Sequence, residues 1–234
     1  AKHVVTCIDP RDDADWSEEF SRFSLKKKVL YPVIRAFEDA RRVHHAVRDA
    51  DQVVCQTKFI APKVERMYQP KSNPIFIGNP SSFPGAAPRK AKKPTVCFLA
   101  RLDKQKRPEL FFELATHYPH VDFIAIGKAH DAAWDQELRD RYARLDNVEM
   151  VGYVDPFKSD QISEILEKSW ILINTASREG LPAAFVEAAS YRCAILATVN
   201  PDEFASEFGY FADSPEALPG GLDHLLENDR WRTC

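Results

Sequence analysis

Two glutamates and two cations in this chain are spaced so that they could bind and process one ligand. The segment NTASREGLPAAFVEAAS carries Glu179 and Glu187 eight positions apart, and the segment ARLDKQKRP carries Arg101 and Lys106. Carboxylates accept hydrogen bonds from hydroxyl groups, while guanidinium and ammonium groups form strong, charge-assisted bonds to phosphate. The set suits a ligand with both hydroxyls and phosphate, such as a sugar nucleotide. Taken alone, two glutamates at this spacing are more typical of an ordinary surface loop followed by an amphipathic helix than of a ligand site.

The residues between the two glutamates favour a loop that turns into a helix. Gly180 permits a tight bend, and Pro182 suits the first turn of a helix, where its missing N–H would have no partner. The free N–H groups at the start of a helix attract anions. We therefore expect the backbone around Leu181, Pro182 and Ala183 to lie beside a bound anion, with one glutamate before the helix and the other about two turns along it.

These residues lie in a half of the sequence that alternates between short apolar runs and amphipathic stretches. Strands are predicted at 95–100, 121–126, 148–151, 170–173, 194–197 and 210–211, and helices at 108–116, 132–145, 161–168, 183–191 and 215–226. Strict alternation predicts an α/β fold with a doubly wound parallel sheet covered on both faces. The loops that follow the strands of such a sheet open on one edge, where ligands bind.

Four of these loops carry residues of the kinds that ligand sites use. The candidates in the first three loops are Arg101, Lys106, Gly127, Gly152, Tyr153 and Val154, and the fourth loop holds the glutamate segment. Glycine lets a ligand approach the backbone closely. The fold therefore predicts that cations, glycines and a helix N-terminus converge on one crevice.

The first half of the sequence is expected to form a second, smaller domain with strands and helices of its own. Strands are predicted at 4–8, 51–55 and 74–77, a helix capped by Thr57 at 57–67, and a polar loop in the acidic stretch 9–19. Apolar residues recur at helical spacing from 25 to 48, which predicts one long amphipathic helix bent near Pro32. A Pro-, Ala- and Lys-rich linker at 81–94 separates domain 1–80 from domain 95–234.

Composition limits the classes of protein that the chain could belong to. With 234 residues, 44% hydrophobic and 29% charged, it can form a sizeable core, and a net charge of -3 gives no reason to expect nucleic-acid binding. No apolar run approaches the roughly 20 residues of a membrane-spanning helix, and no signal peptide is visible. Five scattered cysteines (Cys7, Cys55, Cys97, Cys193 and Cys234) favour reduced thiols over disulfides or a metal site.

We therefore expect a cytoplasmic protein. The helix predicted at 25–48 has a basic face with Lys26, Lys27, Lys28, Arg35, Arg41, Arg42 and Arg48. A solvated surface is one interpretation of this face, and contact with an anionic membrane on its cytoplasmic side is the alternative.

Four segments, taken in order, resemble a known enzyme family. FLARLDKQKRPELFFELA, VDFIAIGKA, VEMVGYV and SREGLPAAFVEAAS look like the carboxyl-terminal domain of a family 4 (group 1) glycosyltransferase of the GT-B fold, with Glu179 and Glu187 as its E-x7-E signature. The resemblance is close over 95–215. Residues 1–77 look like the end of the family's amino-terminal Rossmann domain, which faces the acceptor.

The resemblance implies a hexosyltransferase-type activity in polysaccharide or glycoconjugate biosynthesis. Such enzymes transfer a sugar from a UDP- or GDP-sugar, retain the anomeric configuration, and use neither a metal nor a further cofactor. By similarity, Arg101 and Lys106 would hold the diphosphate, Glu179 the donor-sugar hydroxyls and Glu187 the ribose. Gly152, Tyr153 and Val154 would line the base, and the acceptor would be a glycan or a lipid-linked molecule.

The sequence departs from the family pattern in three ways. Ile8 stands before Asp9 where a histidine is usual, and Asn79 is followed by Pro80 where Asn-Gly is usual. Most of an amino-terminal domain is missing and the chain stops at Cys234, so we expect a fragment or the ordered part of a longer protein. A nucleotide-sugar-binding domain without catalysis is therefore an alternative. Another GT-B enzyme, an epimerase or a phosphorylase, is a third hypothesis.

Overall fold

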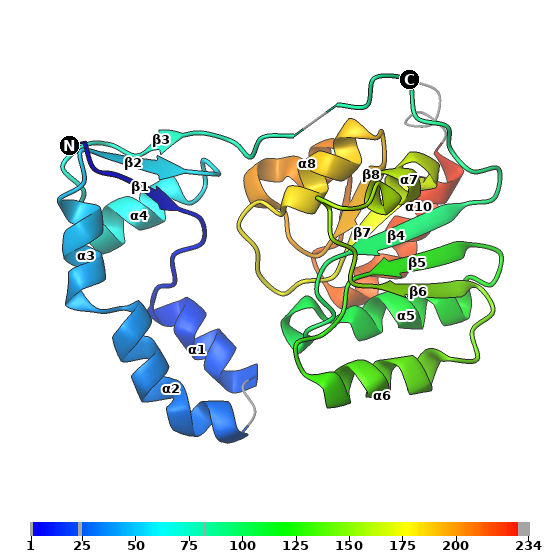
Figure 1. The fold of residues 1–234 in the computed structure, drawn as a ribbon, viewed down its shortest axis with the longest axis horizontal. Coiled ribbons are helices and arrows are strands. Elements are labelled where there is room, and N and C mark those ends of the chain that lie inside the picture. The colour runs from blue at the N-terminus through cyan, green and yellow to red at the C-terminus, as the bar shows by residue number, and fades with distance from the viewer. Residues whose placement is uncertain (1, 23–24, 82, 229–234) are drawn as a thin grey trace. The chain divides into compact units, whose positions relative to one another are not determined.

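The computed structural model describes residues 2–22, 25–81 and 83–228, and it divides the chain into two compact units, Ala1–Asn79 and Pro80–Cys234. The side chains of Lys26 and Lys27, which belong to the predicted basic face, lie outside the described residues, as does Cys234. Each unit is described by itself below (Figure 1).

The second unit contains one six-stranded parallel sheet in the order β6-β5-β4-β7-β8-β9. Its strands are β4 (Thr95–Leu99), β5 (Asp122–Ile126), β6 (Val148–Gly152), β7 (Ile171–Asn174), β8 (Ala194–Ala197) and β9 (Gly209–Phe211). From β4 the chain adds strands toward one edge, and from β7 it adds them toward the other. The doubly wound α/β sheet predicted from the sequence is thus confirmed.

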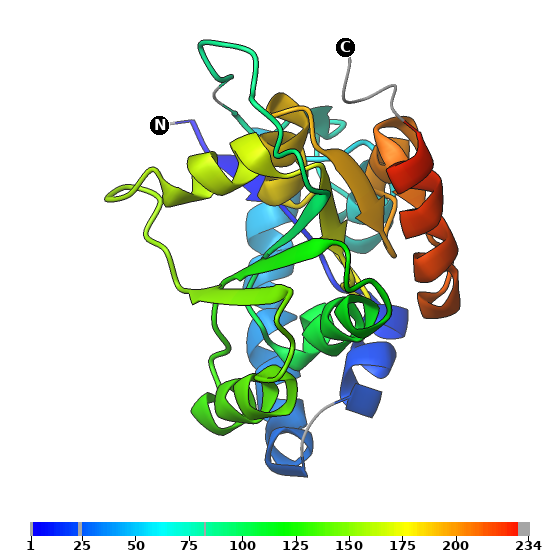
Figure 2. The same cartoon turned by 90° about the vertical axis from the view of Figure 1, so that its right-hand side faces the viewer.

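Helices cover both faces of this sheet, as Figures 1 and 2 show. The longer helices are α5 (Pro108–His117), α6 (Ala132–Tyr142), α7 (Gln161–Lys168), α8 (Ala183–Ser190) and α10 (Leu218–Glu227); α9 (Phe204–Glu207) and the 3₁₀ turns η1 (Lys104–Lys106), η2 (Pro201–Glu203) and η3 (Pro215–Ala217) are short. One buried cluster joins the sheet to α5, α6 and α10, and a second joins it to α7, α8 and α9.

Aromatic rings fill the core between α5 and the sheet. Phe111 of α5 lies with its ring centroid 5.4 Å from that of Phe98 and 5.2 Å from that of Phe123, and Phe112 stacks on Tyr142 of α6 at 4.9 Å. Such buried rings contribute a large apolar area at every contact. They hold β4 and β5, and therefore the loops that follow them, in fixed positions.

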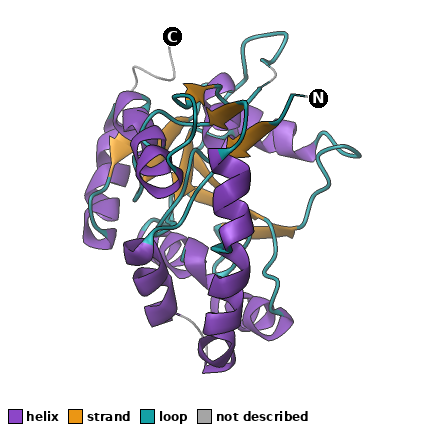
Figure 3. Cartoon of the chain, turned by 90° about the vertical axis from the view of Figure 1, so that its left-hand side faces the viewer, coloured by secondary structure: helices purple, strands orange, loops and turns teal. Residues whose placement is uncertain are grey.

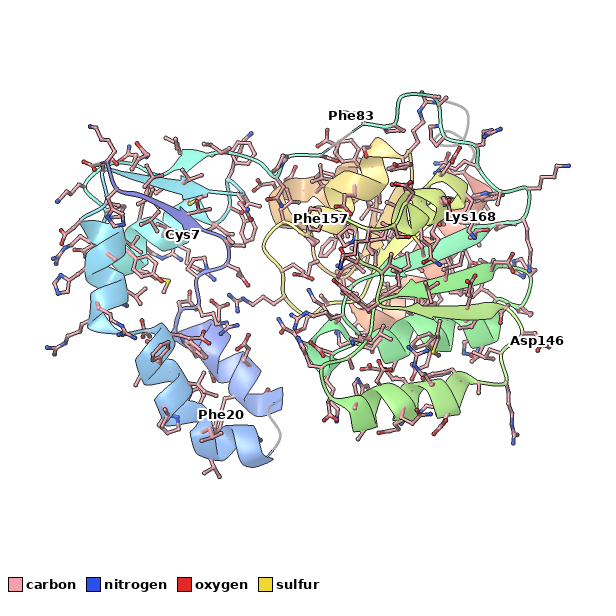
Figure 4. All side chains as sticks on the ribbon, viewed as in Figure 1. Cys7, Phe20, Phe83, Asp146, Phe157 and Lys168 are labelled. Carbon is pink, nitrogen blue, oxygen red and sulfur yellow. The ribbon has the colours of Figure 1, made fainter. Side chains whose placement is uncertain are left out.

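The first unit has a three-stranded parallel sheet in the order β1-β2-β3. Its elements are β1 (Val4–Cys7), α1 (Asp13–Arg22), α2 (Leu25–Glu38), α3 (Arg41–Arg48), β2 (Gln52–Cys55), α4 (Ala61–Tyr68) and β3 (Ile75–Phe76). Figure 3 colours the strands orange and the helices purple. The core of this unit includes Cys7, labelled in Figure 4, with Val53, Cys55 and Val64.

Three local predictions for the first unit were wrong. The acidic stretch 9–19 is not a loop along its length, because α1 begins at Asp13. Asp12 Oδ1 accepts from the N–H groups of Ala14 and Asp15 at 3.1 Å, and the N–H of Asp12 donates back to Asp15 Oδ2 at 2.9 Å. This reciprocal pair is a capping box built from aspartates.

The predicted helix at 25–48 is two helices, α2 and α3, which Figure 1 shows as separate coils. Pro32 lies inside α2, and the chain breaks instead at Ala40, whose extended backbone precedes α3. Thr57 does not cap a helix either, because α4 begins four residues later and Ile60 takes the capping position without a side-chain hydrogen bond.

The last residues of the predicted linker are fastened to the second unit. The N–H of Ala91 donates to the carbonyl of Lys168 at 3.0 Å, and Trp170 Nε1 donates to the carbonyl of Ala91 at 2.8 Å. Lys90 Nζ donates to the carbonyls of Leu166 and Ser169 at 3.2 and 2.5 Å. This part of the chain is therefore built into the end of α7 and the start of β7.

Across the described ranges, every helix is either too short or too polar to cross a membrane.

Candidate functional site

The centre of the second unit's sheet is a topological switch point. Strands β4 and β7 are neighbours there, and the connections that leave them run toward opposite edges of the sheet. Open α/β sheets bind ligands in the crevice that such a divergence leaves at the carboxyl ends of the strands. The β4 loop (residues 100–107) and the β7 loop (residues 175–182) leave the sheet at this point (Figure 1).

An ion pair joins the two loops. Lys106 Nζ of the β4 loop contacts Glu179 Oε1 of the β7 loop, although the residues are 73 positions apart in sequence. Their side chains are only 15% and 14% exposed. The structure therefore brings a predicted cation and a predicted carboxylate together at the switch point, with each group satisfying the other.

Hydrogen bonds from Thr175 and Ser177 also hold the two loops together. The hydroxyl of the fully buried Thr175 lies 2.7 Å from the carbonyl oxygen of Lys106 and 2.9 Å from that of Arg107, and the N–H of Ser177 donates to the carbonyl of Gln105 at 3.3 Å. The two loops are therefore fixed to each other by their backbones as well as by the ion pair.

Arg107 adds a link that the sequence did not predict. Its backbone is left-handed, with φ +47° and ψ +51°, and its guanidinium contacts the β7 loop and Thr198, which follows β8. A left-handed backbone at a residue other than glycine costs about 1–2 kcal/mol. The sequence gives no signal for this conformation, because a residue directly before proline favours extended backbone.

Arg101 belongs to a different cluster on the β4 loop. Its Nη1 lies 2.8 Å from Asp103 Oδ2 and 2.9 Å from His130 Nδ1, and the N–H of His130 donates to Asp103 Oδ1 at 2.8 Å. Burial would raise the pKa of Asp103, but these hydrogen bonds and the Arg101 charge hold it below its ordinary value. The Arg101 side chain is 53% exposed, so it is accessible to a ligand.

Gly127 and Gly152 bring the ends of β5 and β6 close to their neighbours. Gly127 has φ +138°, and a Cβ there would lie 2.0 Å from the carbonyl oxygen of Ala100. Its N–H donates at 2.8 Å to the carbonyl of Gly152, whose φ is +85°. Only glycine fits the first position, because the β4 loop passes directly over it.

The residues after Gly152 differ in exposure. Tyr153 is 66% exposed, and Lys128 Nζ lies 5.8 Å from the centre of its ring, whereas Val154 is buried in the core. Phe157, labelled in Figure 4, lies farther along the same loop and is 95% exposed. Tyr153 and Phe157 therefore present aromatic surface at this edge of the sheet.

The residues between the two glutamates form the entry to α8. Gly180 is buried at a bend, Leu181 packs against the core, and Pro182 precedes the helix rather than opening it, because Ala183 is the first helical residue. The prediction of Pro182 within the first turn was therefore one residue early. No side chain caps this helix.

Glu187 lies on α8 and is half-buried. Burial raises the pKa of its carboxyl group above the ordinary value, and within the described part of the chain this carboxylate makes no hydrogen bond or ion pair. A half-buried carboxylate without a protein partner can accept hydrogen bonds from a ligand. Glu179 is paired with Lys106 and Glu187 is not, so the two glutamates occupy different environments.

The predicted cations and Glu179 thus come from loops that follow strands of one sheet, whereas Glu187 comes from α8. Lys106 and Glu179 touch, while Arg101 is bound to Asp103 and His130. Among the described residues no cluster of three or more His, Cys, Asp or Glu side chains could hold a metal ion. The arrangement can present cations to an anion and carboxylates to hydroxyl groups.

The sequence matches the family described as "Glycosyl transferases group 1" over residues 83–233, which is more than half of the chain. Among curated proteins, one subunit of the Homo sapiens phosphatidylinositol N-acetylglucosaminyltransferase is 24% identical over 189 residues, covering 76% of this chain and 36% of the relative. The protein of the same name from Arabidopsis thaliana is 28% identical over 139 residues, covering 58% and 28%. The chain spans about a third of the length of these relatives.

Solved structures with a similar fold are glycosyltransferases and related enzymes. A mutant of S. aureus TarM, in complex with fondaparinux, alpha-GlcNAc-glycerol and UDP, has a TM-score of 0.71 at 16% identity over 98% of this chain and 45% of TarM. WaaG, a glycosyltransferase involved in lipopolysaccharide biosynthesis, scores 0.67 at 14% identity, covering 98% and 67%. Anabaena HepE, in complex with UDP and glucose, scores 0.67 at 16% identity, covering 97% and 62%.

Proposed function

Because the chain belongs to the group 1 glycosyltransferases, we propose that it transfers a sugar from a nucleoside-diphosphate sugar to a glycan or lipid-linked acceptor. The Lys106–Glu179 pair at the switch point is the observation that carries this proposal. It sets a phosphate-binding cation against a hydroxyl-binding carboxylate at the edge where open α/β sheets take ligands. A bound donor would replace the contact between the two side chains, because its phosphate would bind Lys106 and its hydroxyl groups would bind Glu179.

The main physical demand of the reaction is the charge that develops on the leaving diphosphate. Positive groups fixed in advance where this charge develops stabilise the transition state. Lys106 and Arg101 fit that role because both lie on the β4 loop, which buried aromatic rings and Gly127 hold in place. No side chain caps α8, and the N–H groups of its first turn, beginning at Ala183 beside Leu181, would add further donors.

The two carboxylates would bind the hydroxyl groups of the donor. Glu179 would accept hydrogen bonds from the sugar hydroxyls once Lys106 turns to phosphate. Glu187, half-buried and without a protein partner among the described residues, would accept from the ribose hydroxyls. Gly152, Tyr153 and Val154 would line the base, with the exposed ring of Tyr153 available for stacking.

The names of the curated relatives suggest the first substrates to test. They are phosphatidylinositol N-acetylglucosaminyltransferase subunits, and the TarM and HepE structures contain UDP. We propose UDP-N-acetylglucosamine as donor and phosphatidylinositol as acceptor. We also propose that transfer retains the anomeric configuration and needs no metal. NMR of the product anomer tests the first point, and an unchanged rate in EDTA supports the second.

A lipid acceptor would require contact with a membrane from the cytoplasmic side. The side chains of Val29, Val33 and Phe37 are 80%, 67% and 68% exposed and recur every four residues along α2, so they form one apolar stripe. The Arg42 guanidinium lies 4.7 Å from the ring centre of Phe37, and Lys28 directly precedes Val29 in the chain. We propose that this face rests on anionic lipid. Sedimentation with lipid vesicles tests the idea. Val33→Asp should weaken binding to anionic vesicles, and neutral vesicles should bind the wild-type protein weakly.

Calorimetric titration with UDP and GDP, together with a donor-hydrolysis and transfer assay, tests the proposed function. We expect binding of one nucleoside diphosphate, and a loss of about 100- to 1,000-fold in turnover for Lys106→Ala if the ammonium stabilises the transition state. Binding without turnover would favour the alternative, a nucleotide-sugar-binding domain without catalysis. Failure to bind either diphosphate would contradict both.

A further inference from the structure

Arg107 is a cation at the switch point whose hydrogen bonds reach other loops of the protein. Its Nε donates to the carbonyl of Thr175 at 2.6 Å, and its Nη2 donates to the carbonyl of Ala176 at 3.1 Å and to the hydroxyl of Thr198 at 2.8 Å. These acceptors follow β7 and β8, whereas Arg107 ends the loop that follows β4. One side chain therefore links three loops of the same sheet edge.

From these bonds we infer that Arg107 is a positioning residue. By fixing the β4 loop against the β7 loop, it places Lys106 so that its ammonium group binds the donor's diphosphate. The inference rests on the proposed function. Lys106 is the preceding residue, and its carbonyl shares the Thr175 hydroxyl with that of Arg107. A shift of Arg107 would therefore move both the Lys106 backbone and the start of the loop that carries Glu179.

The chemistry of the contact requires a guanidinium rather than any cation. Its donors form a rigid planar fork, so that Nε and Nη2 can hold two successive carbonyls, those of Thr175 and Ala176, at fixed separation. A lysine carries the same charge on a flexible stem and presents one nitrogen. Thr198 completes the arrangement, since its hydroxyl also donates to the carbonyl of Ala176 at 2.8 Å.

The backbone of Arg107 makes it possible to separate this role from simple stability. The residue is left-handed, a conformation that glycine adopts freely, so Arg107→Gly removes the guanidinium and relieves the backbone strain together. Arg192 offers a matched control. It is also left-handed, with φ +59°, but it lies between α8 and β8, at the opposite end of the strands.

Calorimetry with UDP and UMP, and in parallel with GDP and GMP, measures the part of the affinity that the second phosphate supplies. We expect Arg107→Gly and Arg107→Lys to lower the diphosphate-to-monophosphate affinity ratio at least tenfold, while monophosphate affinity stays within twofold of the wild type. Arg192→Gly should leave the ratio unchanged. The Tm of Arg107→Gly should stay close to that of Arg192→Gly, because each substitution relieves strain.

Each remaining outcome has a definite meaning. An unchanged ratio in both Arg107 variants overturns the inference and leaves the proposed function standing. Equal loss of monophosphate and diphosphate binding with a lower Tm also overturns it, since it assigns Arg107 a purely structural role. A wild-type chain that binds no diphosphate defeats the proposed function instead. If Arg107→Gly does not fold, Thr198→Val, which removes one acceptor of the fork, should lower the same ratio in the same direction.

Discussion

Glu179→Gln should strengthen the binding of a free nucleoside diphosphate. In the structure Lys106 is engaged by Glu179, and both side chains are about 85% buried. Phosphate must compete with this carboxylate for the ammonium group. A hydrogen bond to a charged group contributes about 1.5–3 kcal/mol, and each 1.4 kcal/mol is tenfold in affinity. Removing the competing charge while keeping the shape of the side chain should therefore tighten UDP binding by about tenfold to 100-fold.

The same substitution should act differently on the complete donor. A sugar attached to the diphosphate offers hydroxyls that need the Glu179 carboxylate, and an amide accepts such hydrogen bonds less strongly. UDP-N-acetylglucosamine should therefore gain less affinity than UDP, and the ratio of the two dissociation constants should move by about tenfold. Titration calorimetry of both ligands on wild type and variant measures the two effects together.

Glu137→Gln provides a control of equal charge change. Glu137 pairs with Arg141 on the exposed surface of α6, so its loss should leave UDP affinity within twofold. Weaker or unchanged UDP binding in Glu179→Gln would refute the competition between carboxylate and phosphate for Lys106. It would then follow that the ammonium group reaches the diphosphate without leaving its protein partner.

Three further predictions concern stability and burial. Burial raises the pKa of Glu187, so its ionisation makes the folded protein less stable as the pH rises above 4.5, the ordinary pKa of a glutamate. Glu187→Gln should therefore raise the Tm at pH 7, and this gain in Tm should vanish below pH 4.5. Gly127→Ala would place a Cβ 2.0 Å from the Ala100 carbonyl oxygen and should destabilise by about 3 kcal/mol or more in urea unfolding, whereas Gly152→Ala, with its nearest neighbour at 3.9 Å, should cost about 1 kcal/mol. The four described cysteines are buried, and burial raises the pKa values of their thiols, that of Cys7 to about 11. Thiol reagents at pH 8 should therefore label these cysteines only after the protein unfolds.

Each of these outcomes has a counterpart that would contradict it. A Tm difference for Glu187→Gln that persists at pH 4 would mean that the carboxyl group acts through its shape and not its charge. Equal destabilisation by the two glycine substitutions would remove the case for close approach at Gly127. Rapid labelling in native Cys234→Ser protein would show that a described thiol is accessible.

The sequence predicted the second unit well because its four central strands, β4, β5, β7 and β8, are largely buried. Such strands appear as short apolar runs, and the predicted bounds of α7 and β8 coincide with the observed ones. Local signals sufficed there, since glycine, proline or polar residues separate the runs. The carboxyl-edge loops could therefore be identified before any coordinates.

The first unit was harder to predict because its signals conflict. Asp12 and Asp15 resemble part of an acidic loop, yet aspartates at that spacing cap the start of α1. The helical spacing of apolar residues continues across the break at Ala40, so the sequence pattern of α2 and α3 looks like that of one long helix. Periodicity reports which residues share a face, and it does not report whether the axis continues between them.

Contacts across loops could not be predicted from the sequence at all. Lys106 and Glu179 are each candidates by residue type, but nothing indicates that they pair, because their contact depends on β4 and β7 being neighbours. In the sequence Arg107 is one more basic residue, since its left-handed backbone and its long-range acceptors exist only in the folded chain. The sequence therefore indicates which residue types are available, whereas their contact partners are known only from the folded structure.

The fastening of Lys90 and Ala91 to α7 and β7 has a mechanical consequence. Any swing of one unit against the other must take place in the chain before Arg89, because the residues after it move rigidly with the second unit. A glycine insertion near residue 86 should thus alter the freedom of that swing, whereas the same insertion at residue 91 would break the hydrogen bonds that hold this segment to Lys168 and Trp170.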